Sequence, residues 1–178
     1  MIRRAISDDS LFLSALAQRV FVETFQGDPD HKPHDLAMHL SGALGAETLA
    51  REVSDPQTPY YVVEDAEKPQ RPMIAYLKLS HGHAPACVSG ARPLEIARLY
   101  VDFAYHRTGV AHALMQRAVE HAAAGGFETL WLGVWHRNVR AQRFYRKWRF
   151  EHVGEHPYIF GTDHQVDFVF ARPLTMRD

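Results

Sequence analysis

The chain has 178 residues, of which 46% are hydrophobic and 23% are charged, and 20 basic residues balance 21 acidic ones. A chain of this length buries roughly 70% of the surface that its unfolded form exposes, so we expect a single globular domain over residues 1–178. The formal net charge of −1 argues against a dedicated nucleic-acid binder, which carries a clear basic excess. No run of about 18 apolar residues occurs, and this excludes a membrane span.

The cysteine and histidine content further limits the class of protein. Cys87 is the only cysteine, so no intramolecular disulfide can form and no cysteine-based zinc site can close. The pairs His81/His83 and His31/His34 lack an accompanying carboxylate pattern, and we expect no metal. The N-terminal arginines are followed at once by acids, without an apolar stretch of signal-peptide length. These features predict a cytoplasmic protein.

The first third of the chain predicts one strand and three helices. Ser7, Asp8 and Asp9 are good helix N-caps. Apolar residues then recur at steps of three and four, which predicts an amphipathic helix that ends before a turn at 27–30. Its expected apolar face consists of Leu11, Leu13, Leu16, Val20, Phe21 and Phe25. The other elements expected here are a strand over 2–6 and helices over 34–44 and 46–53.

The rest of the chain alternates strands with two helices. Strands are expected over 60–64, 73–79, 94–101, 127–135, 150–154 and 166–171. A helix over 110–124 ends at two glycines, and Asn138 can cap a second helix that runs to about Trp148. The crossover from 94 to 135 is expected to be right-handed and parallel. This order of elements predicts a mixed α/β fold.

The segment from Leu94 to Ala111 carries the first chemical signal. A strand ends at Val101, and a short turn from His106 to Ala111 enters a helix. The first turn of a helix has unpaired N–H groups and a partial positive charge, and small residues let a pyrophosphate approach the backbone. With Gly109 as its one glycine, the pattern fits both a phosphate cradle and an ordinary strand-to-helix loop.

The second signal is the pattern Asn-x-x-Ala-x-x-Phe-Tyr over residues 138–145. Together with the turn at 106–111, in this order and spacing, it resembles the GNAT superfamily of acetyl-CoA-dependent N-acetyltransferases. The motifs of the resemblance span 94–150, and the order of elements matches over nearly the whole chain. Two positions depart from the family pattern: His106 stands where Gln or Arg is usual, and Arg149 stands where Gly is usual.

The resemblance implies a fold and a co-substrate. The fold is a mostly antiparallel twisted sheet with one splayed parallel strand pair and helices on both faces. The co-substrate is acetyl-CoA, with its pantetheine arm beside the end of the strand 94–101 and its pyrophosphate on the amides of the turn. The residues that the resemblance assigns to the cofactor are Leu99, Tyr100, Val101, His106, Arg107, Thr108, Gly109, Val110, Ala111, Asn138 and Tyr145.

The resemblance also implies catalytic roles. The acceptor amine must attack the thioester in its neutral form, although the pKa of a lysine-type amine is about 10.4. Glu95 matches the general base of several relatives, often acting through water, and is otherwise an exposed strand carboxylate. Tyr145 matches the acid that protonates the departing thiolate, and is otherwise a core aromatic. The Val101 N–H is expected to stabilise the oxyanion.

The acceptor is expected to be a small primary amine. The segments 23–25, 94–101 and 130–135, with the late pattern from Gly154 to Asp167, resemble the PaiA-type bacterial spermidine/spermine N-acetyltransferases. A polyamine site presents carboxylates and aromatic faces. The candidates are Glu23, Asp28, Asp30, Asp35, Tyr158, Asp163 and Asp167. The alternatives are peptide or protein N-acetylation and a non-catalytic acetyl-CoA-binding module. No nucleic-acid or membrane partner is expected, and a homodimer is left open.

Overall fold

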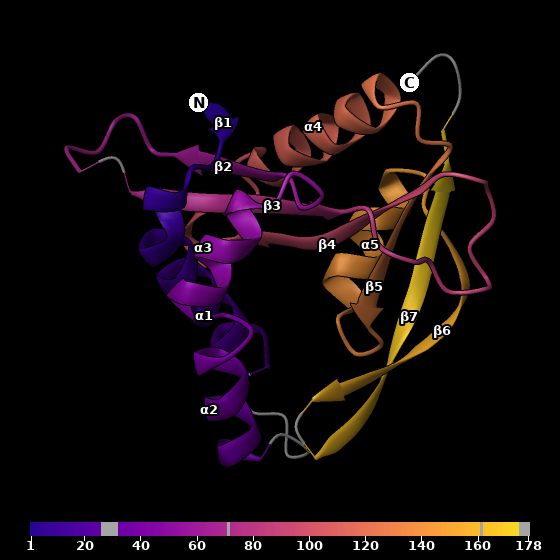
Figure 1. The fold of residues 1–178 in the computed structure, drawn as a ribbon, viewed down its shortest axis with the longest axis horizontal. Helices are drawn as coiled ribbons and strands as arrows, with labels where there is room; N and C mark the ends of the chain where they lie inside the picture. The colour runs from indigo at the N-terminus through magenta and orange to yellow at the C-terminus, as the bar shows by residue number, and fades with distance from the viewer. Residues whose placement is uncertain (26–31, 71, 161, 175–178) are drawn as a thin grey trace. The chain divides into compact units, whose positions relative to one another are not determined.

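The computed structural model describes residues 1–25, 32–70, 72–160 and 162–174. The expected turn at 27–30, and with it Asp28, Asp30 and also His31, lies outside the described residues. The helices are η1 (Ser7–Asp9), α1 (Ser10–Phe25), α2 (Pro33–Ser41), α3 (Ala46–Ser54), η2 (Phe103–Tyr105), α4 (Val110–Ala124) and α5 (Val139–Lys147). The strands are β1 (Ile2–Arg4), β2 (Tyr60–Glu64), β3 (Met73–Ser80), β4 (Pro93–Val101), β5 (Thr129–Trp135), β6 (Glu151–Phe160) and β7 (Asp163–Pro173) (Figure 1).

The strands form one seven-stranded sheet in the order β1-β2-β3-β4-β5-β7-β6. β1 with β2, β2 with β3, and β5 with β7 are antiparallel pairs. β4 and β5 are parallel, with Leu94 opposite Leu130 and Glu95 opposite Trp131. The predicted mixed α/β fold, with a mostly antiparallel sheet and one parallel pair, is confirmed.

The chain divides into two compact units. Unit 1 comprises residues 1–78, 98–115 and 160–163, and unit 2 comprises residues 79–97, 116–159 and 164–178. The single domain expected over residues 1–178 stays a prediction. Within the described ranges, no helix combines the length and apolar content that a membrane-spanning helix needs.

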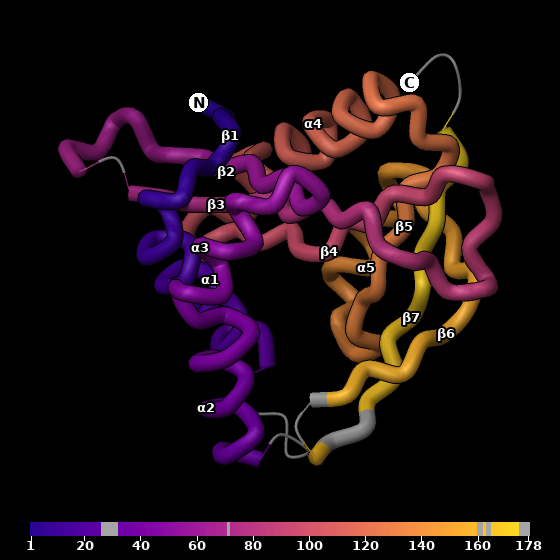
Figure 2. The backbone as a smooth tube through the Cα atoms, in the orientation of Figure 1, coloured from indigo at the N-terminus to yellow at the C-terminus, as the bar shows by residue number. Residues whose placement is uncertain are grey.

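The helices α1 and α3 lie side by side in unit 1 (Figures 1 and 2). Leu13, Leu16 and Phe21 of α1 are buried, but Leu11 is 71% exposed. The expected apolar face is therefore wrong at its first position. Residues that are two positions apart in an α-helix are separated by about 200° around its axis. Leu11 therefore points away from the face that begins at Leu13. The predicted cap Asp9 instead belongs to η1, where its carboxylate pairs with Arg3 at 2.7 Å.

The two faces of β5 have different surroundings in unit 2. Leu130, Leu132 and Val134 are buried on one face. On the other face, Trp131 packs with its neighbours on β7 and with the loop between β3 and β4. The members of this cluster are Trp131, Val169 and Ala171, with Ala84, Cys87 and Val88 packed against them.

The last two strands are longer than predicted. Strands were expected over 150–154 and 166–171, whereas β6 and β7 span ten and eleven residues and lie side by side (Figures 1 and 2). β6 is the edge of the sheet, and Glu151, Val153, Glu155 and His156 are exposed. An exposed edge strand needs no regular apolar alternation, so its residues carry a weak strand signal.

Candidate active site

The turn between β4 and α4 belongs to unit 1 and is held by side-chain contacts. Asp102 Oδ1 accepts the Ala104 N–H at 2.9 Å and thereby caps η2. Tyr105 Oη donates to Asp65 Oδ2 at 2.7 Å. Thr108 Oγ1 donates to the Tyr105 carbonyl at 2.7 Å. These contacts fix the backbone immediately before α4.

The first turn of α4 begins directly after Gly109. The Ala113 N–H donates to the Gly109 carbonyl at 3.0 Å, which makes Gly109 the first residue to accept a helical bond. An α-helix leaves the N–H groups of its first turn, here those of Val110 and Ala111, without an intrahelical acceptor. Gly109 has a φ of 91°, and a methyl group on it would meet no atom within 4 Å. The start of α4 thus has first-turn amides without intrahelical acceptors, and the role of the turn as a phosphate cradle stays a prediction.

The end of β4 presents backbone groups on the side away from β3. The Asp102 N–H donates to the Ile74 carbonyl of β3 at 2.9 Å. Because successive amides of a strand point to opposite sides within the sheet plane, the Val101 N–H points away from β3. The Leu99 N–H points the same way. An extended ligand on that side of β4 can therefore accept from both amides.

Two residues of the turn fold in ways that the sequence alone does not show. His106 Nε2 lies 3.1 Å from the Val101 carbonyl oxygen, and its ring lies 4.4 Å from that of Phe103. The imidazole thus folds back along the turn. Arg107 has a φ of 67°, in the left-handed region that favours glycine, and its side chain is exposed.

Asn138 and Tyr145 belong to α5 and its cap in unit 2. Asn138 Oδ1 accepts the Ala141 N–H at 3.0 Å, which confirms the predicted cap. Gln142 Nε2 donates to the His136 carbonyl at 2.8 Å and ties the helix to the end of β5. Tyr145 is 9% exposed, and its ring lies edge-on to Phe150 at 5.9 Å. The packing of Tyr145 is that of a core aromatic, and its acid role stays a prediction.

Glu95 also belongs to unit 2, so the expected site residues are divided between the two units. Unit 1 holds residues 99–101 and 106–111, and unit 2 holds Glu95, Asn138 and Tyr145. Glu95 is half-buried, and its register opposite Trp131 places both residues on the same face of the sheet. Its role as base stays a prediction.

The candidate acceptor-binding carboxylates differ in their surroundings. Asp35 is buried and accepts from Thr162 Oγ1 at 2.7 Å, and this bond holds the pKa of the carboxyl below its usual value. Glu23 is exposed on α1. Tyr158 and Asp167 are half-buried, on β6 and β7. The side chain of Asp163 lies outside the described part of the structure. Asp35 is therefore the least accessible of the described carboxylates.

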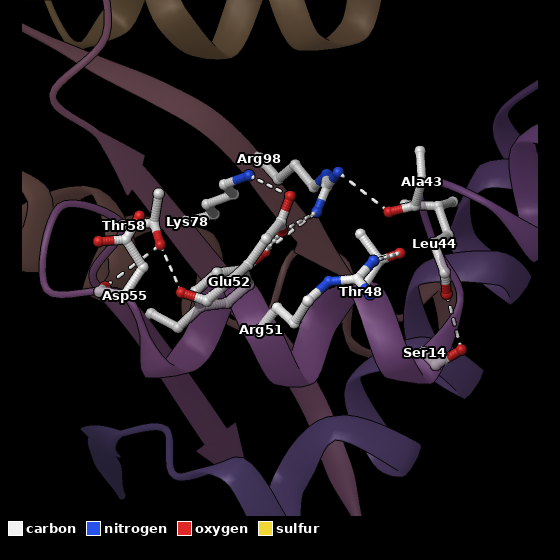
Figure 3. A network of polar contacts seen from close by, with 11 residues as sticks. Ser14, Ala43, Leu44, Thr48, Arg51, Glu52, Asp55, Thr58, Lys78 and Arg98 are labelled. Atoms are coloured by element: carbon white, nitrogen blue, oxygen red, sulfur yellow. Dashed lines mark hydrogen bonds and ion pairs between the residues drawn. The ribbon is translucent and has the colours of Figure 1, made fainter.

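A polar network in unit 1 was not predicted (Figure 3). Glu52 of α3 pairs with Lys78 at 2.8 Å and with Arg98 at 3.0 Å, and it accepts from Tyr60 Oη. Arg98 also donates to the Ala43 carbonyl at 3.3 Å. Burial raises the pKa of Glu52, but the two cations outweigh burial and hold this pKa below its ordinary value. The network joins α3 to three strands, β2, β3 and β4.

Aromatic and imidazole side chains surround this network. Burial and the charge of Arg98 lower the pKa of His39 to about 4, so this imidazole is neutral at pH 7. Tyr76 Oη is buried without a hydrogen-bond partner within the described residues, and the Tyr76 ring lies 5.3 Å from that of Tyr100. The sequence signal for this network was the presence of Lys78 and Arg98 inside strands that are mostly apolar.

Residues 18–150 match the model of the acetyltransferase (GNAT) family, and the chain therefore belongs to this family. It is similar to an uncharacterised N-acetyltransferase of Mycobacterium bovis, with 31% identity over 162 residues that cover 91% of this chain and 96% of the relative. An uncharacterised N-acetyltransferase of Lactobacillus delbrueckii subsp. lactis is 29% identical over 161 residues, which cover 90% and 89% of the two chains.

Two solved structures have the same fold over nearly the full length. One is the PaiA N-acetyltransferase of Thermoplasma acidophilum in complex with coenzyme A, with 18% identity, a TM-score of 0.73 and 98% of each chain covered. The other is an Escherichia coli N-acetyltransferase for an alanine of a ribosomal protein, with 17% identity, a TM-score of 0.67, and 99% and 94% of the chains covered. At these identities the likeness shows the fold alone.

Family membership decides the class of reaction. The protein is an N-acetyltransferase, and acetyl-CoA is its co-substrate. The predicted enzyme class and co-substrate are confirmed.

Proposed function

We propose that the protein transfers the acetyl group of acetyl-CoA to a primary amine of a small molecule, with a polyamine such as spermidine or spermine as the acceptor. The observation that carries the proposal is a pair of residues in unit 2: Asp167 of β7 lies opposite Trp135 of β5 in the sheet register. A carboxylate beside an aromatic ring attracts an ammonium group. The resemblance of several sequence segments to the PaiA-type enzymes supports the same acceptor.

We further propose that the turn at 106–111 holds the pyrophosphate of acetyl-CoA. The first-turn amides of α4, the positive helix end and the open space above Gly109 support this assignment. The backbone of Leu99 to Val101 is proposed to pair with the pantetheine arm through the amides that point away from β3. Asn138 and Tyr145 are proposed as cofactor contacts because the family resemblance assigns them to acetyl-CoA.

Acetyl-CoA supplies the activated acetyl thioester. The protein has to remove protons from the amine and supply one to the thiolate. Presenting a lysine-type amine in its neutral form at pH 7 costs about 3.4 pKa units, or roughly 4.6 kcal/mol. A nearby base lowers this cost, and Glu95 is the base that the family pattern proposes. Tyr145 is proposed to protonate the departing thiolate, whose pKa is near that of a cysteine thiol. The Val101 N–H is proposed to donate to the oxyanion.

Binding of acetyl-CoA is testable without knowledge of the acceptor. A ligand at one hundred times its dissociation constant stabilises the folded state by about 2.7 kcal/mol. For a chain of this size, that corresponds to a rise in Tm of roughly 5–10 °C. A thermal-shift titration with acetyl-CoA measures it, and acetate serves as the control. A Tm that does not respond up to millimolar acetyl-CoA contradicts the assignment of the turn.

The acceptor is tested with an amine panel. The protein is incubated with acetyl-CoA and with spermidine, spermine, lysine or short peptides with free N-termini, and the released thiol is measured. We expect saturable thiol release with spermidine and spermine, above the rate without amine. Peptide N-acetylation is the second candidate, because the fold is shared with the enzyme that acts on a ribosomal-protein alanine. Release with peptides alone contradicts the polyamine proposal.

A further inference from the structure

One face of unit 2 is covered at one end and open at the other. Along β5, Trp131, Gly133 and Trp135 share this face, and their partners on β7 are Ala171, Val169 and Asp167. The loop between β3 and β4 covers the end at Trp131. At the other end Gly133 is exposed and Asp167 is half-buried. A carboxylate thus lies on the part of the face that solvent reaches.

Gly133 makes room for this carboxylate. A methyl group on Gly133 would lie 3.3 Å from Asp167 Oδ2 and 3.9 Å from Asp167 Cγ. The carboxyl group therefore extends from β7 toward β5 and borders the space that a side chain at position 133 would take. A methyl group at 133 would therefore require a shift of a few tenths of an ångström between it and the carboxyl. The glycine in the Trp-Leu-Gly-Val-Trp segment, which the sequence motif singled out, thus has a direct geometric purpose.

The groups around the carboxyl are titratable or aromatic. His136, which follows β5, and His156, on β6, act electrostatically on the Asp167 carboxyl, and Arg137 lies over the ring of Trp135 at 6.0 Å. His136 Nδ1 is 3.0 Å from the Val166 carbonyl oxygen, which fixes the position of its ring. Burial raises the pKa of Asp167 to about 6, although both histidines act to lower it. The carboxyl is thus ionised at pH 7 and more basic than an exposed one.

Asp167 and Tyr145 belong to opposite sides of the β5–β7 pair. Arg146 of α5 lies over the ring of Phe170 at 5.2 Å, so α5 packs against the face that carries Phe170. Because side chains alternate along β7, Asp167 is on the other face. An amine bound by Asp167 therefore approaches from the face of the β5–β7 pair opposite α5.

We propose that Asp167 is the catalytic base that takes the proton of the acceptor ammonium. This rests on the proposed function. The ammonium gives one proton to Asp167, and the nitrogen lone pair then forms the C–N bond to the acetyl carbon. The C–S bond breaks with its electron pair on sulfur. The second nitrogen proton passes to solvent as the amide forms, and the thiolate takes a proton from Tyr145, which regains one from solvent, so that amide and thiol are the products. Asp167 then returns its proton to solvent.

Asp167 and Glu95 are alternative candidates for the catalytic base, because the strand register places them far apart. Glu95 lies opposite Trp131, and Asp167 lies opposite Trp135, four residues further along β5. Four strand residues span about 13 Å. One amine nitrogen therefore cannot contact both carboxylates.

The experiment compares Asp167→Asn with Glu95→Gln and with a control, Glu155→Gln, on the exposed edge strand. Steady-state rates are measured between pH 5 and pH 9, with spermidine or with whichever amine of the panel the parent acetylates. For Asp167→Asn we expect kcat to fall by a factor of about 10² or more, with the KM for acetyl-CoA unchanged. We also expect the kcat/KM profile to lose its acid limb, which is the decrease in kcat/KM as the pH falls through about 6. The control should match the parent.

Chemical rescue adds a measurement that distinguishes a catalytic role of Asp167 from a purely structural one. In Asp167→Ala, formate should restore part of the lost activity, whereas chloride at the same ionic strength should not. The proposal is overturned if Asp167→Asn keeps kcat within threefold of the parent and keeps the acid limb. It is equally overturned if Glu95→Gln alone loses that limb. A parent that acetylates peptides and no polyamine instead contradicts the polyamine acceptor, and the same variants then test Asp167 with the peptide.

Discussion

Replacing Asp167 by Asn is expected to stabilise the protein, and the gain should depend on pH. The carboxyl of Asp167 has a pKa raised from its ordinary value of 3.8 to about 6, chiefly because it is buried. Above pH 6 the carboxyl is ionised in both the folded and the unfolded chain, and the folded chain bears the cost of a partly desolvated charge. As the pH falls through 6, the folded state takes up a proton and this cost disappears. Asparagine has a similar size and no charge, so it avoids the cost at every pH.

The magnitude follows from the shift in pKa. A rise of roughly two units at 1.36 kcal/mol per unit gives an upper value of about 3 kcal/mol. Because the carboxyl is half-buried and solvent screens part of its charge, we expect about 1.5–3 kcal/mol. For a chain of this size, each kcal/mol moves the Tm by about 2–4 °C. The difference in Tm between variant and parent should therefore grow by roughly 4–10 °C between pH 4 and pH 7.5.

The assay is thermal or urea unfolding of parent, Asp167→Asn and the control Glu155→Gln at half-unit steps from pH 4 to pH 8. The difference between Asp167→Asn and the parent should rise through pH 5–6 and level off above pH 7. The control should run parallel to the parent at all pH values, because Glu155 is exposed. A difference that stays constant across this range would falsify the reasoning, because it would mean that Asp167 titrates alike in the folded and unfolded states.

Three further substitutions test the site and its supports. Tyr145→Phe should lower kcat by a factor of about 10² to 10⁴ with little change in acetyl-CoA affinity, because the ring that packs on Phe150 is kept; a rate within threefold of the parent rules out the acid role. Gly109→Ala, at a φ of 91°, should cost about 1–2 kcal/mol of stability and raise the KM for acetyl-CoA, while Gln116→Ala provides an exposed control on α4 outside the turn. Arg149→Gly, at a φ of 63°, should raise the unfolding free energy by about 0.5–1 kcal/mol in urea titration, and an unchanged midpoint contradicts this account of the helix end.

The parts that the sequence predicted well are those that local interactions define. The helix expected over 110–124 has these bounds in the structure, and Asn138 caps α5 as expected. Both depend on residues a few positions apart in the chain. The expectation at position 149 was incomplete: Arg149 was noted in place of the usual glycine, but only the structure shows that this position has left-handed backbone.

The parts that the sequence missed depend on pairing between distant segments. Glu52, Lys78 and Arg98 come from a helix and two strands, and no spacing within the chain links them. Asp167 was identified as a carboxylate for an ammonium, but its burial follows from the register of β7 on β5, which also brings its carboxyl beside Gly133. A pattern of residue types indicates neither the strand register nor the burial of a side chain, so the raised pKa of Asp167 could not be predicted.

The arrangement of tryptophans along β5 gives the protein two optical probes in one strand. Trp131 is 7% exposed, and its indole N–H is buried without a hydrogen-bond partner within the described residues. Its fluorescence should therefore be blue-shifted and indifferent to added amine. Trp135 is half-buried and paired with Asp167, so its emission should change when that carboxyl gains a proton or when a cation settles beside it. Subtracting the spectrum of Trp135→Phe isolates this signal, and the strand then reports acceptor binding without any attached dye.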